Sequence, residues 1–383
     1  MSDNIPFEIQ AQIIKNLPVK SLIQFRSVSK TWKSLIDSSD FVKHYSGQHT
    51  RMQHLVVTYD DPDRERKYVS IADDETLPQH KVSPTIPPLV STLKYSTIIG
   101  TSHGLLCSYV DEPKGIAVIW NLLIGKSVSV DVPNIAPFGT FGTVVGFGVC
   151  PETMDPKIVK ITHIDTWDDI ESITSIPWQV EVFTLSAGAW RTPNSSNLPR
   201  KSIHFNFGSV VTDGTLYWLA TDRVNTPAGY NYYILIISFD MTSEEFGEIF
   251  LPDSLARLLE DDLSIFKLRS TLAVLESYMD DAGFGVWMML GGVYKSFIRL
   301  FTIKSPDMLV RGFRKSGEPI IEFVEHLPDI SGVRCASSLV VYEPYAKDMI
   351  YLEINVFDNS FSVYPYTETL LLLDHPDNII YDR

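Results

Sequence analysis

The residues best suited to chemistry in this 383-residue chain form the run Gly100-Thr101-Ser102-His103-Gly104, which matches the G-x-S-x-G nucleophile elbow of serine hydrolases. In that elbow a strand precedes the serine and a helix follows it, which exposes the hydroxyl group at the edge of a parallel sheet. The residues that follow here, LLCSYV, predict a second strand instead. We therefore interpret the run as a tight, glycine-containing turn at the start of a strand. A serine hydrolase that uses Ser102 stays as the less favoured alternative.

Other nucleophilic and metal-ligating residues do not combine into a site. The nine histidines form no H-E-x-x-H motif, and the three cysteines form no C-x-x-C pair. Cys107 and Cys150 lie within apolar runs, which is typical of buried structural thiols. We expect no catalytic residue, no metal and no cofactor.

Acidic residues occur in four clusters between predicted strands: Asp60-Asp61, Asp168-Asp169, Glu260-Asp261-Asp262 and Asp280-Asp281. Such clusters are typical of solvated turns. The alternative is that some of them line a target-binding face, because loops that connect rigid strands often carry binding residues.

Composition indicates an ordinary soluble globular protein, with 44% hydrophobic and 21% charged residues. No apolar run approaches the roughly 20 residues of a membrane-spanning helix. The first residues, MSDNIPFEIQ, contain neither a basic leader nor an apolar stretch, so no signal peptide is expected. Three widely spaced cysteines, Cys107, Cys150 and Cys335, suggest a reducing compartment. We expect the protein in the cytosol or nucleus, with no membrane partner.

Charge is distributed unevenly along the chain. The first 45 residues contain six basic and four acidic residues, whereas the remainder contains 26 basic and 43 acidic residues. An acidic body repels phosphate groups, so no nucleic-acid partner is expected, and basic partners are mildly favoured. The alternative interpretation is that the negative charge serves solubility.

Residues 1–45 show the periodicity of three short helices. Ile9, Ile13 and Leu17 recur every four residues in a helix that begins near Pro6, and Pro18 ends this helix. A second short helix follows, with Leu22, Ile23 and Phe25 as its buried candidates. A third begins near Ser27 or Ser29, with Val28, Trp32, Leu35 and Ile36 at helical spacing. Three helices of this length make a small core, so part of their apolar surface should be covered by a partner or by the rest of the chain.

The same residues resemble the F-box, the helical module of substrate receptors in Skp–cullin–F-box ubiquitin ligases. The order I-P-x-E, NLPVKSL and FRSVSKTWKSLI carries the resemblance over about 40 residues. Many F-boxes begin with Leu-Pro, and Ile5-Pro6 stands here instead. The resemblance implies that nine residues supply either adaptor-facing or module-core positions, which periodicity alone cannot divide: Pro6, Ile9, Ile13, Leu17, Pro18, Leu22, Phe25, Val28 and Trp32.

From residue 51 onward the chain is rich in short strand-forming runs separated by turn residues. Runs that end in an aromatic residue recur at intervals that average about 57 residues, close to the size of a four-stranded propeller blade. The aromatics are Tyr59, Trp120, Phe183, Phe239, Trp287 and Tyr342. Phe301 could replace Trp287 as the marker of the fifth unit. The tryptophans Trp120, Trp190, Trp218 and Trp287 are expected in the cores between blades.

The repeat predicts an all-β, propeller-like domain with six blades over residues 51–383, and hence an α+β multidomain chain. The runs GLLCSYV, TVVGFGVC, GTLYWLA and STLAVLES are the candidates for inner strands, and residues 251–263 are the one expected helical connection. A propeller requires ring closure, which the TETLLLL segment at residues 367–373 could supply by pairing with the first blade. A pair of β-sandwiches is the alternative architecture.

The β domain is also similar to the F-box-associated domain of the large plant F-box family, some members of which are kelch-like. The segments GTSHGLLC, IWNLLIGKSVSVDVP, VFTLSAGAWRTP and ISFDMTSEEFGEIFLP carry this resemblance. It implies a non-catalytic substrate receptor that binds a Skp-type adaptor, and through it a cullin and a ring-finger subunit, while the β domain collects a target protein. It supplies no list of target-binding residues. A scaffold that acts outside a ligase is the alternative.

Overall fold

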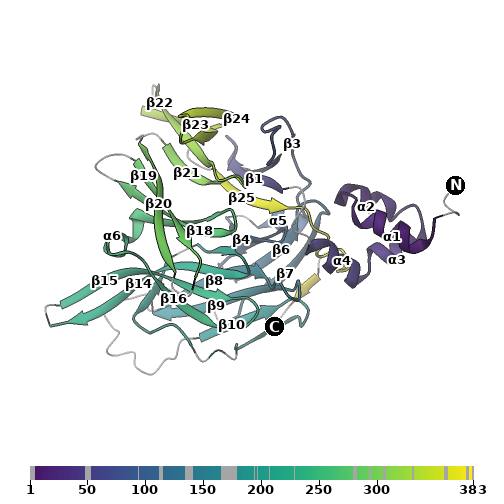
Figure 1. Ribbon diagram of the computed structural model, residues 1–383, viewed down its shortest axis with the longest axis horizontal. Coiled ribbons are helices and arrows are strands. Elements are labelled where there is room, and N and C mark those ends of the chain that lie inside the picture. The colour runs from purple at the N-terminus through teal and green to yellow at the C-terminus, as the bar shows by residue number, and fades with distance from the viewer. Residues whose placement is uncertain are drawn as a thin grey trace.

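The computed structural model places a small helical bundle beside a six-bladed β-propeller (Figure 1). It describes residues 5–47, 53–93, 95–111, 115–133, 141–164, 179–193, 195, 197–206, 208–227, 229–278, 283–292, 295–304, 308–329, 332–357, 361–376 and 379–381. The α+β multidomain architecture predicted from the sequence is confirmed.

The helical bundle contains α1 (Phe7–Lys15), α2 (Val19–Phe25), α3 (Lys30–Ile36) and α4 (Ser39–Ser46). Pro6 and Pro18 precede the first two helices, as their fixed φ angles favour. Ser29 and Ser38 cap the next two by accepting hydrogen bonds from the backbone N–H groups of Thr31 and Phe41. The predicted three-helix module is therefore present, and α4 follows it as a fourth helix that the sequence analysis did not include.

Each blade is one sheet of at least four strands, antiparallel except for the β26–β7 pair of the second blade. The first blade contains β25 (Ser362–Thr367), β1 (Gln53–Asp60), β2 (Arg66–Ala72) and β3 (Lys81–Val82). The second contains β4 (Thr97–Ser102), β5 (Leu105–Val110), β6 (Ile116–Asn121), β7 (Lys126–Asp131) and β26 (Ile379–Tyr381), the last of which pairs with β7 in parallel. The third contains β8 (Phe141–Val149), β9 (Pro156–Ile164), β10 (Gln179–Thr184) and β11 (Ala189–Arg191).

The remaining three blades follow the same plan. The fourth contains β13 (Val210–Thr212), β12 (Ile203–Phe205), β14 (Thr215–Thr226), β15 (Gly229–Asp240) and β16 (Phe246–Phe250). The fifth contains β17 (Leu263–Leu268), β18 (Thr271–Tyr278), β19 (Gly283–Leu290) and β20 (Ser296–Lys304). The sixth contains β21 (Met308–Phe313), β22 (Pro319–Asp329), β23 (Gly332–Glu343) and β24 (Asp348–Phe357). Between blades lie α5 (Pro88–Thr92), α6 (Asp253–Ala256) and a 3₁₀ turn at Glu260–Asp262, so the helical connection expected at 251–263 is short and interrupted.

The innermost strands close into a ring. Neighbouring contacts run from β25 to β4, β8, β13, β17 and β21 and back to β25. This closed order excludes the two-sandwich alternative. The ring is closed by β25, which pairs with β1 from Gln53 opposite Thr367 to Thr58 opposite Ser362. The prediction that residues 367–373 pair with the first blade was therefore wrong for all but Thr367, because Leu370, Leu371, Leu372 and Leu373 are buried in a turn beside α4.

The aromatic repeat marks the third strand of most blades. Trp120, Phe183, Phe239, Trp287 and Tyr342 lie in β6, β10, β15, β19 and β23, which confirms Trp287 over Phe301 as the fifth marker. Tyr59 lies instead in β1, the second strand of its blade, because the C-terminal β25 supplies the first. Of the four predicted inner strands only TVVGFGVC is innermost, as β8, and the others are the second strands β5, β14 and β18.

The residue after the marker begins a tight turn to the outer strand in the blades marked by Trp120, Phe183, Phe239 and Tyr342. In these four blades its carbonyl oxygen accepts a hydrogen bond from the backbone N–H four residues later, at N···O distances of 2.7 to 3.1 Å. The donors are Gly125, Gly188, Glu244 and Lys347, whose φ angles of 68°, 63°, 60° and 56° lie in the left-handed region. Glycine adopts this region freely, whereas a residue with a Cβ is strained there. The repeat thus encodes one turn geometry.

This geometry predicts opposite effects of two substitutions. Lys347→Gly should raise the free energy of unfolding by about 0.5–1 kcal/mol, because it relieves left-handed strain at an exposed side chain. Gly125→Ala should lower it by about 1 kcal/mol, because an added Cβ meets no atom within 4 Å and only the φ penalty is introduced. Urea denaturation of the full chain measures both, and effects of the same sign would contradict the assignment.

A buried ionic cluster links the third and fourth blades. The Glu244 carboxylate accepts hydrogen bonds from Lys157 Nζ at 2.8 Å and from both Nη atoms of Arg191 at 2.7 and 2.5 Å. Burial by itself would raise the pKa of Glu244, but the hydrogen bonds from Arg191 and Lys157 outweigh it and hold the pKa below 4.5. The ionised carboxylate therefore stabilises the fold above pH 4.5, and this contribution is lost as the pH falls through the lowered pKa.

Glu244→Gln should lower the free energy of unfolding by about 3 kcal/mol at pH 7, because it leaves Lys157 buried and charged without a carboxylate. The difference from the wild type should shrink progressively below pH 4.5, where the wild-type carboxylate takes up a proton. Chemical denaturation from pH 3 to pH 8 measures it. Glu248→Gln is the matched control, since its partner Arg200 is largely exposed and such pairs contribute about 0–1 kcal/mol. A pH-independent difference would contradict the linkage.

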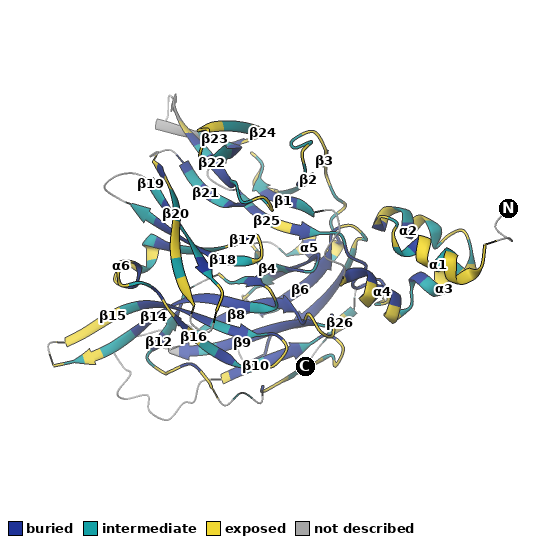
Figure 2. Cartoon of the chain, in the orientation of Figure 1, coloured by how far each residue is buried: buried dark blue, intermediate teal, exposed yellow. Residues whose placement is uncertain are grey.

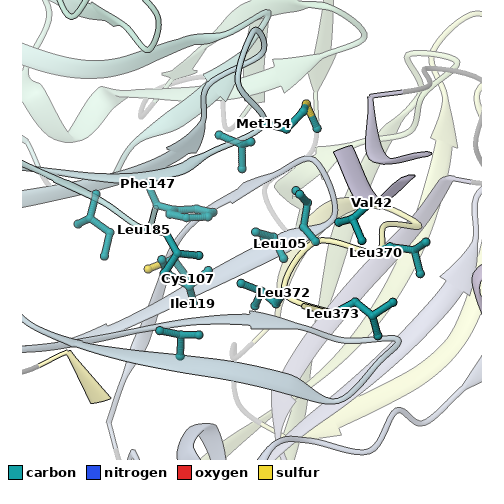
Figure 3. Close-up of a cluster of buried hydrophobic side chains, with 14 of the residues drawn as sticks. Val42, Leu105, Cys107, Ile119, Phe147, Met154, Leu185, Leu370, Leu372 and Leu373 are labelled. Carbon is teal, nitrogen blue, oxygen red and sulfur yellow. The ribbon is translucent and has the colours of Figure 1, made fainter. Parts of the chain in front are cut away.

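The helical bundle and the propeller share one hydrophobic core. Figure 3 shows Val42 of α4 facing Leu370, Leu372 and Leu373, with Leu105 and Phe147 of the propeller beyond them. Two hydrogen bonds from backbone donors to side-chain acceptors strengthen the junction: Leu370 N–H donates to Ser46 Oγ at 3.2 Å, and Val19 N–H donates to Glu368 Oε2 at 3.3 Å. The fourth helix therefore attaches the bundle to the propeller.

Candidate functional site

The outer face of the helical bundle exposes large apolar side chains. Of the 17 exposed large hydrophobic residues among those the structure describes, five lie within the first 28 residues of the chain: Ile5, Phe7, Ile9, Ile13 and Val28. Figure 2 shows exposed residues along α1, whereas α4 is buried on one face through Phe41, Val42, Tyr45 and Ser46. Apolar side chains gathered on one small element mark an interaction surface.

The structure divides the nine residues that the sequence analysis left together. Five are exposed: Pro6, Ile9, Ile13, Pro18 and Val28. Three are half-buried, namely Leu17, Phe25 and Trp32, and Leu22 is completely buried. The exposed set is available to a partner, whereas Leu22 belongs to the core of the bundle. The assignment of the exposed set to an adaptor stays a prediction.

The half-buried residues hold the bundle together. The rings of Phe25 and Trp32 meet edge to face with centroids 5.2 Å apart. Trp32 Nε1 donates to Gln10 Oε1 at 3.2 Å, which ties α3 to α1. The carbonyl oxygen of Leu17 accepts a hydrogen bond from the Tyr45 hydroxyl at 2.8 Å. Substitutions at these positions would disturb folding as well as binding.

Helix geometry explains why neighbouring isoleucines have opposite roles. Ile13 is 51% exposed, whereas Ile14, one residue later and about 100° around the helix, is 3% exposed and packs in the shared core. Ile5, Ile9 and Ile13 follow one another at intervals of four residues. Ile5 and Phe7, each 43% exposed, extend the apolar face and were missed by the sequence analysis. Their signal was the apolar pair that flanks Pro6.

The Ser102 motif is a hairpin turn. β4 ends at Ser102 and β5 begins at Leu105, with His103 and Gly104 at φ angles of 46° and 76° between them. Ser102 Oγ accepts a hydrogen bond from the backbone N–H of Val149 at 3.0 Å, and a Cβ at Gly104 would lie 2.0 Å from the Thr367 carbonyl oxygen. A strand follows the serine, so the arrangement that a hydrolase elbow requires is missing here.

The cysteines and the metal-ligating residues form no site among the described residues. Cys107 and Cys150 are buried, as predicted, and burial raises the pKa of the Cys107 thiol, whereas the side chain of Cys335 lies outside the described residues. Among the described residues, no group of three or more His, Cys, Asp or Glu side chains is placed to hold a metal ion. No described helix has both the length and the apolar character needed to cross a membrane.

Two of the four predicted acidic clusters lie within the described residues, and both occur in turns. Asp61 accepts hydrogen bonds from the backbone N–H groups of Asp63 and Glu65, which is the geometry of a turn. Glu260–Asp262 forms the 3₁₀ turn before β17, and residues 168–169 and 280–281 lie outside the described residues.

Trp120 and Trp218 are fully buried between strands, while Trp190 and Trp287 are half-buried against hydrophobic clusters, in agreement with core roles.

Fold and surface together define a class of protein: a short helical module with an exposed apolar face, attached to a β-propeller. Sequence comparison identifies both parts. The F-box domain matches residues 2–44, and the F-box associated beta propeller domain matches residues 55–313. The second match covers more than half of the chain, so the chain belongs to the family of F-box proteins with an F-box associated β-propeller domain.

The chain is similar to several F-box proteins of Arabidopsis thaliana. The chain is similar to F-box/kelch-repeat protein At3g23880, with 26% identity over 80% of this chain and 82% of the relative. It is also similar to F-box protein CPR1, with 26% identity over 79% of this chain and 73% of that protein. Putative F-box protein At3g52320 is 27% identical over 65% of this chain and 60% of its own length.

Solved structures are only distantly similar. The WD40 domain of SCAP from fission yeast aligns with a TM-score of 0.31 and 7% identity, over 83% of this chain and 85% of that one. Prolyl oligopeptidase B from Galerina marginata aligns with a TM-score of 0.35 and 10% identity, over 81% of this chain and 43% of that one. These scores are too low to support any inference about function.

Proposed function

We propose that this chain is the substrate-recognition subunit of a Skp–cullin–F-box ubiquitin ligase, acting in the cytosol or nucleus. The observation that carries the proposal is the apolar face of α1 and its flanking residues, including Ile9 and Ile13, on a bundle whose other side is anchored to the propeller. Burial of such an apolar face against a partner is favourable. Membership of the F-box family favours a Skp-type adaptor as that partner.

The proposed mechanism requires no catalytic group from this chain. The adaptor connects the helical bundle to a cullin and a ring-finger subunit, which brings a ubiquitin-charged conjugating enzyme. The propeller holds the target protein, so that a target lysine and the thioester share one complex. This raises their effective concentration and replaces a rare bimolecular encounter by an intramolecular one.

Reconstitution tests this function. The full chain, co-expressed with a Skp-type adaptor, should elute with it as one complex in size-exclusion chromatography. Addition of a cullin and ring-finger subunit should shift this complex to a larger size. Failure to bind the adaptor would refute the proposal, and adaptor binding without cullin assembly would favour the alternative of a scaffold outside a ligase.

Target identification needs a point variant rather than a deletion. Removal of residues 1–45 would take away most of α4 and uncover part of the shared core, including Leu370, which would create a new apolar surface that captures unrelated proteins. Affinity purification with the wild type and with Ile13→Asp avoids this problem because Ile13 lies outside the shared core. Proteins retained by both chains are candidate targets, and those lost with the variant belong to the ligase.

A further inference from the structure

The propeller contains a cavity of about 670 Å³ at one mouth of its central channel. All six blades contribute to its wall, mostly through the turns between their first and second strands. Among these turns are the Ser102–Leu105 hairpin and the segments that follow β13, β17 and β21. The volume lies within the range of about 300–1,000 Å³ that is usual for small-molecule sites.

The charge of this wall differs from that of the rest of the molecule. Four basic side chains line it, Lys267, Arg269, Arg314 and Lys315, and they come from two adjacent blades. Three acidic side chains line it, Asp73, Asp213 and Glu368. The whole chain, by contrast, has a net charge of −15. With four basic and three acidic side chains, the wall has a small excess of positive charge on an otherwise acidic protein, and a concave site with such an excess attracts anions.

Two of the acidic groups are already engaged with the protein. Asp73 is buried and accepts hydrogen bonds from Arg314 Nε and from the backbone N–H of Lys315, each at 2.8 Å. Glu368 accepts from the backbone N–H of Val19 and lies 3.7 Å from His54 Nε2. The charge of Arg314 is therefore compensated by Asp73, whereas Glu368 belongs to the junction with the helical bundle.

Three basic groups keep charge available for a ligand. Arg269 donates to the carbonyl oxygen of Ser316 through Nε at 3.0 Å and Nη2 at 2.6 Å, which fixes the guanidinium without neutralising it. The ammonium groups of Lys267 and Lys315 form no hydrogen bond or ion pair with the described residues. The charge of Lys315 acts at longer range on Asp74, whose pKa it helps to lower after the hydrogen bonds from Thr76.

Lys267 of β17 has an exposed side chain that lines the cavity. Its side chain is accessible from the cavity, yet the surrounding protein atoms lower its pKa below the usual range, and Asp213 only partly opposes this shift. An anion beside the ammonium group would compensate the lost hydration. Lysine and arginine are also the side chains that most often bind phosphate and carboxylate groups.

We infer that this cavity binds a small multivalent anion, either a phosphate ester or a polycarboxylate, through Lys267, Arg269 and Lys315. The site is separate from the apolar face of α1, so this inference does not depend on the proposed ligase function. Lysines supply mobile point charges, and the anchored Arg269 supplies a fixed donor. Tripolyphosphate serves as the test ligand for phosphate esters, and citrate serves as the test ligand for polycarboxylates.

Isothermal titration calorimetry of the full chain at low ionic strength tests the inference. At least one of the two anions should bind saturably at one site, with an affinity that falls as salt is added. The double variant Lys267→Gln/Lys315→Gln should weaken this binding at least tenfold. Arg269→Gln provides an independent variant and should weaken it as well. Comparison of the two affinities indicates the class of the natural ligand: tighter binding of tripolyphosphate indicates a phosphate ester, and tighter binding of citrate indicates a polycarboxylate.

The matched control removes the same charge elsewhere. Lys295→Gln/Lys347→Gln replaces two exposed lysines that do not line the cavity, so its affinity for the anion should stay within twofold of the wild type. Circular dichroism verifies that every variant is folded. Absence of saturable binding of both anions at millimolar concentration, or equal weakening by the two double variants, would overturn the inference.

Discussion

Ile13→Asp should abolish co-purification of a Skp-type adaptor while it leaves the thermal stability of the chain unchanged. Ile13 is 51% exposed and lies outside the hydrophobic core, so the isolated chain tolerates a charge there. In the proposed complex the same position is covered, and the variant both loses apolar burial and buries an unpaired carboxylate. Together these terms cost at least about 3 kcal/mol, which corresponds to a loss of affinity of more than a hundredfold.

Ile298→Asp is the matched control for this experiment. Ile298 is 41% exposed on β20 of the propeller, so the substitution changes the same chemistry at a similar exposure on a different surface. It should bind the adaptor like the wild type. Leu22→Asp would be uninformative, because Leu22 is fully buried and the variant would unfold the bundle. Adaptor recovery that is equal for Ile13→Asp and the wild type would disprove the assignment of this face.

Asn121→Leu should produce the largest loss of stability, about 5 kcal/mol in the free energy of unfolding. Asn121 is completely buried, and its Nδ2 group donates to the carbonyl oxygens of Thr369 and Leu371 at 3.1 and 3.0 Å. Its Oδ1 atom accepts from the Tyr366 hydroxyl and from the backbone N–H of Leu123. Leucine has a similar volume but leaves these buried groups unpaired, at a cost of about 1–3 kcal/mol each.

Urea denaturation of the full chain measures this loss. Asn197→Leu, at an exposed position, is the control and should change the free energy of unfolding by less than about 0.5 kcal/mol. A loss below 1 kcal/mol for Asn121→Leu would mean that the C-terminal segment contributes little to the closed ring. A large loss would identify Asn121 as the residue that fastens the second blade to the chain end.

Local signals were enough to predict the first three helices of the bundle, although not α4. Pro6, Pro18 and Ser29 mark helix starts through backbone constraints and capping, which act within a few residues. The exposed face could not be predicted in the same way. Ile13 and Ile14 have the same chemistry, and they differ because Ile14 belongs to a core cluster that includes Leu370 to Leu373, more than 300 residues away in sequence.

The propeller repeat was predictable for a related reason. In four blades the marker aromatic lies in the third strand and is followed by a tight turn of the same geometry, so the pattern recurs along the sequence. The innermost strands gave weaker signals, because β13 is only three residues long. The closing strand β25 contains Pro365, a residue that argues against a paired strand in sequence analysis, and its partner β1 lies at the opposite end of the chain.

The shared core between α4 and the C-terminal turn has a mechanical consequence. A receptor joined by a flexible tether would let its cargo sample many orientations, whereas this junction fixes the angle between the two parts. Under the proposed function, ubiquitin would then reach only those lysines of a bound cargo that fall within a narrow zone of space. Maps of modified lysines should therefore cluster on one side of the cargo, and a glycine-rich spacer inserted after Gly47 should broaden the cluster.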